Sequence, residues 1–97
     1  MERLTLADVL CRAVDELVAA RAAGDAAKLD KLRAALGFLY DVNTDYRGPE
    51  ESYAEYYRDA ALAQLLDDLL DAIRDWFMGT PWKSDIPSHE TIRSRLV

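Results

Sequence analysis

Apolar residues recur at steps of three and four positions through residues 61–77, which is the period of an amphipathic helix. On a helical projection they fill a stripe of roughly 140°. This stripe consists of Leu62, Leu65, Leu66, Leu69, Leu70, Ile73, Trp76 and Phe77. The opposite side carries Asp67, Asp68, Asp71 and Asp75. The segment therefore predicts a helix with one face in a core and a row of carboxylates in water.

Helix signals also bracket two segments nearer the N-terminus. Thr5, with Asp8 three residues on, forms a capping-box pattern ahead of a broad apolar face. Gly24 is placed to end this first helix, and Asp25 to cap the second. The connection between them is so short that it predicts an antiparallel helical hairpin.

The third helix has two candidate starts and one firm stop. Pro49 suits the first turn of a helix, and Ser52 with Glu55 forms a second capping-box candidate. Gly79, with a proline two residues on, ends the helix. A helix over 50–78 would run for roughly 44 Å, so we expect it to overhang its neighbours or to bend.

The start of this long helix is out of phase with its apolar stripe. Extending the stripe backwards puts Glu55 and Asp59 on or beside the core side, and Tyr53 and Tyr57 on the solvent side. Either a kink near Ala60 restores burial, or this part presents a tyrosine-rich surface flanked by acids. The tyrosine rings thus cover the end of the bundle or contact a partner.

These patterns predict one small all-α domain over residues 1–97. A helical hairpin (1–43) precedes an acidic, tyrosine-rich loop and long helix (44–80), and a cap and tail (81–97) follow. The fold class is an antiparallel three-helix bundle with a short C-terminal helix, with helices over about 5–23, 26–42, 50–78 and 88–96. The expected core comprises Leu6, Val9, Leu10, Ala13, Leu17, Leu29, Leu32, Leu36, Leu39, Leu62, Leu66, Leu69, Ile73 and Trp76.

Charge is unevenly distributed along the chain. The net charge is −6, and residues 44–80 carry it all, because they hold nine acids and three bases while the remainder is balanced. An acidic chain is a poor ligand for nucleic-acid phosphates or for an anionic membrane surface. No apolar run approaches the roughly 20 residues of a membrane span, and the single Cys11 cannot form an internal disulfide. We therefore expect a soluble, cytoplasmic protein.

Two patterns suggest metal chemistry. The run from Asp67 to Asp71 is similar to the Asp-Asp-x-x-Asp motif that holds magnesium in isoprenoid synthases, but the second metal motif of those enzymes is missing. All-α nucleotide pyrophosphohydrolases also bind magnesium through helix carboxylates, and here only Asp15 and Glu16 could supply a facing partner. His89 has no cysteine or second histidine spaced for a metal site. We predict no enzyme, no metal and no cofactor.

The acidic, tyrosine-rich segment is instead a candidate protein interface. Carboxylates on a rigid helix can imitate phosphates and occupy a basic groove. The expected function is a protein-binding module, most concretely a small acidic inhibitor or adaptor that covers a basic surface of a nucleic-acid-binding protein. Phage-encoded anti-CRISPR and anti-defence proteins are similar in size, acidity and helicity, though without a shared motif. The partner-binding candidates are Tyr46, Glu50, Glu51, Tyr53, Glu55, Tyr56, Tyr57, Asp59, Asp67, Asp68, Asp71 and Asp75.

Two alternatives to this function remain open. The first is a structural assembly subunit that oligomerises through the long helix, and the second, less favoured, is a magnesium-dependent nucleotide phosphohydrolase. Phe38 and Val42 project away from the apolar stripe of the second helix, and Leu70 and Phe77 lack an evident partner. These four positions leave room for a homodimer through the third helix.

Overall fold

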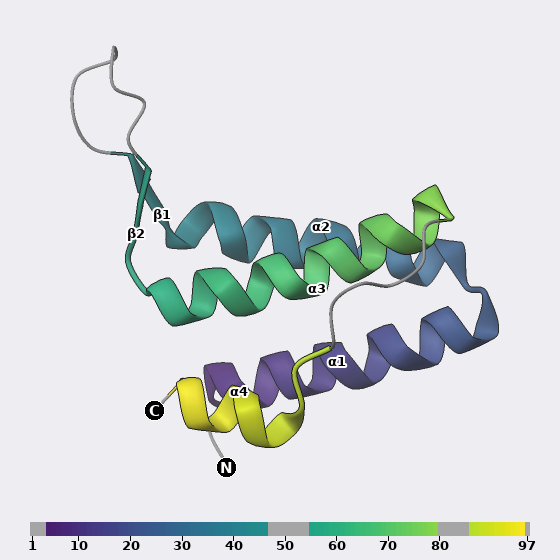
Figure 1. The fold of residues 1–97 in the computed structure, drawn as a ribbon, viewed down its shortest axis with the longest axis horizontal. Helices are drawn as coiled ribbons and strands as arrows, with labels where there is room; N and C mark the ends of the chain where they lie inside the picture. The colour runs from purple at the N-terminus through teal and green to yellow at the C-terminus, as the bar shows by residue number, and fades with distance from the viewer. Residues whose placement is uncertain (1–3, 47–54, 80–85, 97) are drawn as a thin grey trace.

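The computed structural model describes residues 4–46, 55–79 and 86–96. Its elements, in chain order, are α1 (Leu6–Ala23), α2 (Ala26–Asn43), β1 (Thr44–Tyr46), β2 (Glu55–Tyr57), α3 (Ala60–Met78) and α4 (His89–Arg95). Figure 1 shows α1, α2 and α3 alternating in direction, with α2 and α3 side by side and the short α4 lying against α1. The fold is the predicted all-α bundle with a short C-terminal helix.

The caps of α1 and α2 form as the sequence predicts. The Asp8 N–H donates to Thr5 Oγ1 at 3.1 Å, and the Thr5 N–H donates to Asp8 Oδ2 at 3.0 Å, which completes the capping box. Gly24 follows with a left-handed φ of 66°, a conformation that favours glycine. The Asp25 side chain then accepts a hydrogen bond from the Lys28 N–H at 3.0 Å and starts α2. The two helices therefore pack as an antiparallel hairpin.

The predicted start of the third helix at residue 50 is wrong. The backbone of Glu55–Tyr57 is a strand that pairs antiparallel with Thr44–Tyr46, and α3 begins only at Ala60. The phase break therefore marks a change of secondary structure, and a kink near Ala60 is not required. The shorter α3 is about 28 Å long and matches α2, so the expected overhang is also absent over the described residues.

Asn43 ties the end of α2 to the start of α3. It is buried, its Nδ2 donates to the Asp59 carbonyl at 2.9 Å, and its Oδ1 accepts from the Asp59 N–H at 3.0 Å. The Arg58 N–H adds a bond to the Asn43 carbonyl at 2.9 Å. Asn43 thus provides acceptors for the N–H groups of Arg58 and Asp59 between the strand and the helix, and its side-chain N–H adds a bond to the Asp59 carbonyl. Because these bonds hold the two chain segments together, they set where α3 begins.

The core is one cluster to which all four helices contribute. Most of the predicted core positions are buried, while Leu39 and Trp76 are partly buried against the cluster. Leu6 and Val9 were predicted in the core but are 38% and 41% exposed. The sequence-based core also omitted residues that are buried, namely Ala7, Cys11, Val14, Ala20, Leu65, Ala63, Ala72 and Ile92.

The position of α4 explains which side of α1 is buried. Ile92 is fully buried and belongs to the same core cluster as Cys11 of α1, whose thiol lies 4.0 Å from the His89 carbonyl. On the surface, Arg93 Nη1 lies 2.9 Å from an Asp8 carboxylate oxygen, and α4 as a whole packs against α1. Because α4 covers the side of α1 that carries Cys11, the side that carries Leu6 and Val9 stays partly exposed to water.

We expect Asn43→Ala to lower the free energy of unfolding by about 1–3 kcal/mol, because it removes the two side-chain hydrogen bonds that Asn43 makes to the Asp59 N–H and carbonyl. Urea denaturation followed by circular dichroism measures this. The matched control is Gln64→Ala on the exposed side of α3, which should stay within about 0.5 kcal/mol. An equally small effect of both substitutions would contradict the role given to Asn43.

We expect Ile92→Ala to raise the rate at which a thiol reagent modifies Cys11 by at least about tenfold, since truncating a buried isoleucine costs about 2–5 kcal/mol and loosens α4. Cys11 is the only cysteine, so the reaction has a single site. Ser94→Ala, at an exposed position of α4, serves as the control and should react like the parent. Equal rates in all three proteins would show that α4 does not cover the thiol.

Candidate acidic interface on α3

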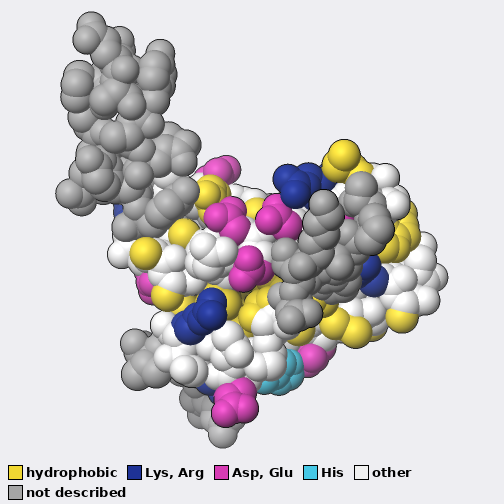
Figure 2. All heavy atoms as spheres, in the orientation of Figure 1, with side chains coloured by type: hydrophobic (Ala, Val, Ile, Leu, Met, Phe, Trp, Pro, Cys, Tyr) yellow, Lys and Arg dark blue, Asp and Glu magenta, His cyan; other side chains and the backbone are white. Residues whose placement is uncertain are grey.

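The exposed side of α3 gathers carboxylates within one to two helical turns. We call Gln64, Asp67, Asp68 and Asp71 the acidic α3 face. The buried residues of α3 cover the opposite half of the helix, which confines these side chains to one strip. Figure 2 shows acidic side chains clustered over α3, beside apolar ones. Gln64 extends the strip, because its Nε2 donates to Asp68 Oδ1 at 3.1 Å.

Asp67 carries the main electrostatic signature of the acidic α3 face. Partial burial raises the pKa of its carboxyl, and the negative charges of Asp71 and Asp68 raise that pKa further. The ionised form is therefore less favourable here than in water. A positive group brought to this face would favour the ionised form of Asp67 and offset the repulsion from Asp68 and Asp71.

Arg74 partly offsets the charge at one end of the acidic α3 face. Its Nη2 lies 3.4 Å from Asp71 Oδ1 and 3.8 Å from Asp75 Oδ1. The guanidinium side chain is 64% exposed, so solvent screens these pairs strongly. The ion pairs of Arg74 therefore reach Asp71 and Asp75, and do not reach Asp67 or Asp68.

Two of the predicted interface residues, Asp59 and Asp75, also interact with other parts of the fold. The Asp75 side chain is only 16% exposed. Burial lowers the pKa of Arg21 on α1, and the negative charge of Asp75 offsets part of that lowering. Asp59 is the N-cap of α3, because its Oδ1 accepts a hydrogen bond from the Leu62 N–H at 3.1 Å. The members of the acidic α3 face make no such contact with another helix or with a helix end in the hydrogen bonds and ion pairs of the described residues.

The tyrosine-rich part of the predicted site is described only in its backbone. The strands pair Asp45 with Tyr56 and Tyr46 with Glu55, so two segments of this part lie side by side. Tyr57 pairs with Thr44 at the base of the same ribbon, next to α3. Glu50, Glu51 and Tyr53 lie outside the described residues, as do the side chains of Tyr46, Glu55, Tyr56 and Tyr57.

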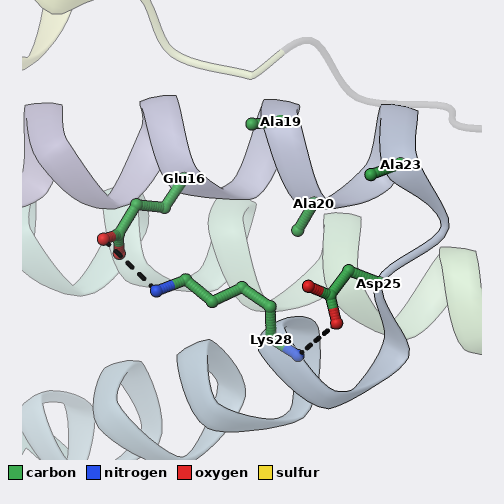
Figure 3. Close-up of a pocket in the computed structure, with 6 residues that line it drawn as sticks. All are labelled: Glu16, Ala19, Ala20, Ala23, Asp25 and Lys28. Atoms are coloured by element: carbon green, nitrogen blue, oxygen red, sulfur yellow. Dashed lines mark hydrogen bonds and ion pairs between the residues drawn. The ribbon is translucent and has the colours of Figure 1, made fainter.

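A shallow hollow of about 410 Å³ lies where α1 ends and α2 begins. Figure 3 shows Lys28 reaching from α2 towards Glu16 of α1, with Nζ 3.3 Å from the carboxylate, and Asp25 accepting from the Lys28 N–H. Alanines supply most of the remaining lining. The Lys28 side chain thus pairs with Glu16 across the hairpin, and the Asp25 side chain caps α2.

Neither metal pattern of the sequence gains a set of converging ligands. Over the described residues, no three side chains of histidine, cysteine, aspartate or glutamate lie where they could hold a metal ion. Asp15, the suggested partner for a magnesium site, pairs instead with His89 Nε2 at 2.9 Å. The Cys11 thiol is buried and lies near the main-chain carbonyl of His89.

Comparisons with protein-family models, with curated proteins and with solved structures gave no match to this chain. Among the described helices, none has the length and apolar character needed to cross a membrane. The acidic α3 face is therefore judged by its own geometry and charge.

We expect Asp67→Asn to raise the thermal unfolding midpoint at pH 7. Because the folded-state pKa of Asp67 is raised, its ionised form destabilises the folded protein at neutral pH. The gain should shrink as the pH falls through that raised pKa and vanish below the unfolded value of 3.8, where the carboxyl is protonated in both states. Circular dichroism melts across this range measure the difference.

Asp8→Asn provides the opposite case in the same melts. The Thr5 backbone and the Arg93 side chain lower the pKa of Asp8 to about 2, so its ionised form stabilises the folded protein. Asp8→Asn should lower the midpoint at pH 7, and this loss should fade as the pH falls from 3.8 towards 2. A lower midpoint for both variants at pH 7 would contradict the crowding assigned to Asp67.

Proposed function

We propose that this protein is a non-enzymatic binding module whose acidic α3 face covers a basic surface of a larger protein. The observation that carries the proposal is the crowding of Asp67, Asp68 and Asp71, which raises the pKa of Asp67. Groups whose pKa is shifted by burial and by neighbouring charges tend to cluster at functional sites. In its most concrete form, the partner is a nucleic-acid-binding protein and the module acts as its inhibitor or adaptor.

The charge density of the acidic α3 face supports a nucleic-acid-like contact. Asp67, Asp68 and Asp71 fall within about 6 Å of helix rise. A strand of duplex DNA carries about one charge per 3.4 Å, which is the same order of linear density. A protein surface that binds phosphates through lysine and arginine would therefore meet a comparable array of anions.

The rigidity of α3 adds to this complementarity. Its inner side chains Leu65, Leu66 and Leu69 are fully buried, and Asp59 and Gly79 cap its two ends. The backbone that presents the carboxylates is thus fixed before binding, so association does not bear the entropy of ordering it. Long-range attraction would also speed the encounter, with a strong dependence on salt.

The non-enzymatic part of the proposal is supported by the state of the groups that could act in catalysis. The Cys11 thiol is covered by α4, and the His89 imidazole is paired with Asp15. The hollow where α1 ends and α2 begins is lined by other residues, so neither group contributes to it. A cytoplasmic site of action remains part of this proposal.

The test is a capture experiment with charge-matched variants. We expect immobilised parent protein to retain basic nucleic-acid-binding proteins from a cell lysate at low salt and to release them at high salt. The variant Asp67→Asn, Asp68→Asn, Asp71→Asn should lose them, because it removes the acidic α3 face. The helix should persist, since these positions lie outside the buried stripe.

The control variant is Glu16→Gln, Asp30→Asn, Glu90→Gln. It changes the net charge by the same amount at described positions outside α3, so it should retain the captured proteins. Equal loss from both variants would mean that only the overall charge matters. Unchanged capture by the first variant would exclude the acidic α3 face as the contact.

A further inference from the structure

The outer side of α2 exposes two adjacent large apolar side chains. Phe38 is 68% exposed and Val42, one turn further on, is 51% exposed. The core side of the same helix is formed by Leu29, Leu32 and Leu36, which are buried. A phenylalanine and a valine side by side on a rigid helix are typical of a contact surface.

A glycine next to Phe38 makes a notch in this surface. Gly37 lies inside α2, where glycine is less favourable than alanine, yet a Cβ placed there would meet nothing within 4 Å. Packing among the described residues therefore does not call for a glycine. Ala34, one turn before Phe38, is also small and exposed. A bulky side chain from another molecule could approach the helix closely over Ala34 and Gly37.

Charges of opposite sign flank the notch on the same side of α2. Lys31 lies one turn before it and Asp41 one turn after it, and both are exposed. No ion pair joins either side chain to another described residue. Along the helix, the outer side thus presents a positive side chain, two small residues, a large apolar side chain and a negative side chain in that order. A second copy that runs in the opposite direction would place its negative end beside the positive end of the first, and its large side chain beside the small residues.

We propose that two copies of this chain associate through their α2 outer faces, antiparallel and related by a twofold axis. Position 36 is the midpoint between positions 34 and 38, and also the midpoint between positions 31 and 41. In an antiparallel pair aligned there, Phe38 of each copy lies over the Ala34–Gly37 notch of the other, and Lys31 lies beside Asp41 of the second copy. One alignment therefore fills both notches and pairs all four charges.

This dimer is independent of the acidic α3 face. It also differs from the homodimer through the third helix that the sequence suggested. Leu70 of α3 packs against the core, and Phe77 lies under the Arg33 guanidinium, 5.0 Å from its ring centroid. The apolar side chains of α2 are more exposed than these.

Analytical ultracentrifugation from micromolar to millimolar protein tests the proposal. The parent protein should pass from monomer to dimer over this range. Phe38→Glu should remain monomeric, whereas Val18→Glu, the same change at an exposed apolar position of α1, should dimerise like the parent. Gly37→Leu should fold normally, because its Cβ position is open, but weaken the dimer by at least about tenfold.

Charge exchange tests the antiparallel arrangement itself. Lys31→Glu and Asp41→Lys should each weaken the dimer, and the double variant should restore it, because the pairs re-form with reversed sign. A parent protein that stays monomeric at millimolar concentration would overturn the proposal. So would equal effects of Phe38→Glu and Val18→Glu, or a double variant as weak as the single ones.

Discussion

The bundle depends on burying the apolar side of α3. Leu65, Leu66, Leu69 and Ile73 are among the fully buried residues, and their positions with their buried neighbours span roughly 180° of the helix. α2 packs against α3 on one flank, and α1 and α4 also contact it. The charged residues of α3 are therefore confined to the remaining strip, where they lie close together. The raised pKa of Asp67 is thus a consequence of how the core is packed.

The sequence predicted those parts of the fold that local interactions determine. The ends of α1 and the start of α2 follow from side chains within four residues of each helix terminus, such as Thr5 and Asp25. The start of α3 was mispredicted because Ser52 and Glu55 resemble a capping box. What decides that start is the hydrogen bonding of Asn43 with Asp59, which lie sixteen residues apart. The phase break in the apolar pattern was the one feature of the sequence that indicated a separate element, the strand β2, ahead of α3.

In the candidate site, too, the sequence predicted what local periodicity determines and did not predict what contacts between helices determine. Asp67, Asp68 and Asp71 were predicted because helix periodicity alone places them on one side. The partial burial of Asp75 beside Arg21 could not be predicted, because Arg21 belongs to another helix and only the packing of α1 against α3 brings the two charges together. Gln64 was missed, although its spacing of four residues from Asp68 puts it on the same side.

The central claim is that the acidic α3 face is where a basic partner binds. The most direct measurement is a titration of isotopically labelled protein with a lysine- and arginine-rich nucleic-acid-binding domain, followed by backbone amide NMR shifts. The account predicts that the largest shifts map to residues 64–71 and disappear at high salt. Shifts that centre on the outer side of α2 around Phe38, or that persist unchanged at high salt, would contradict it.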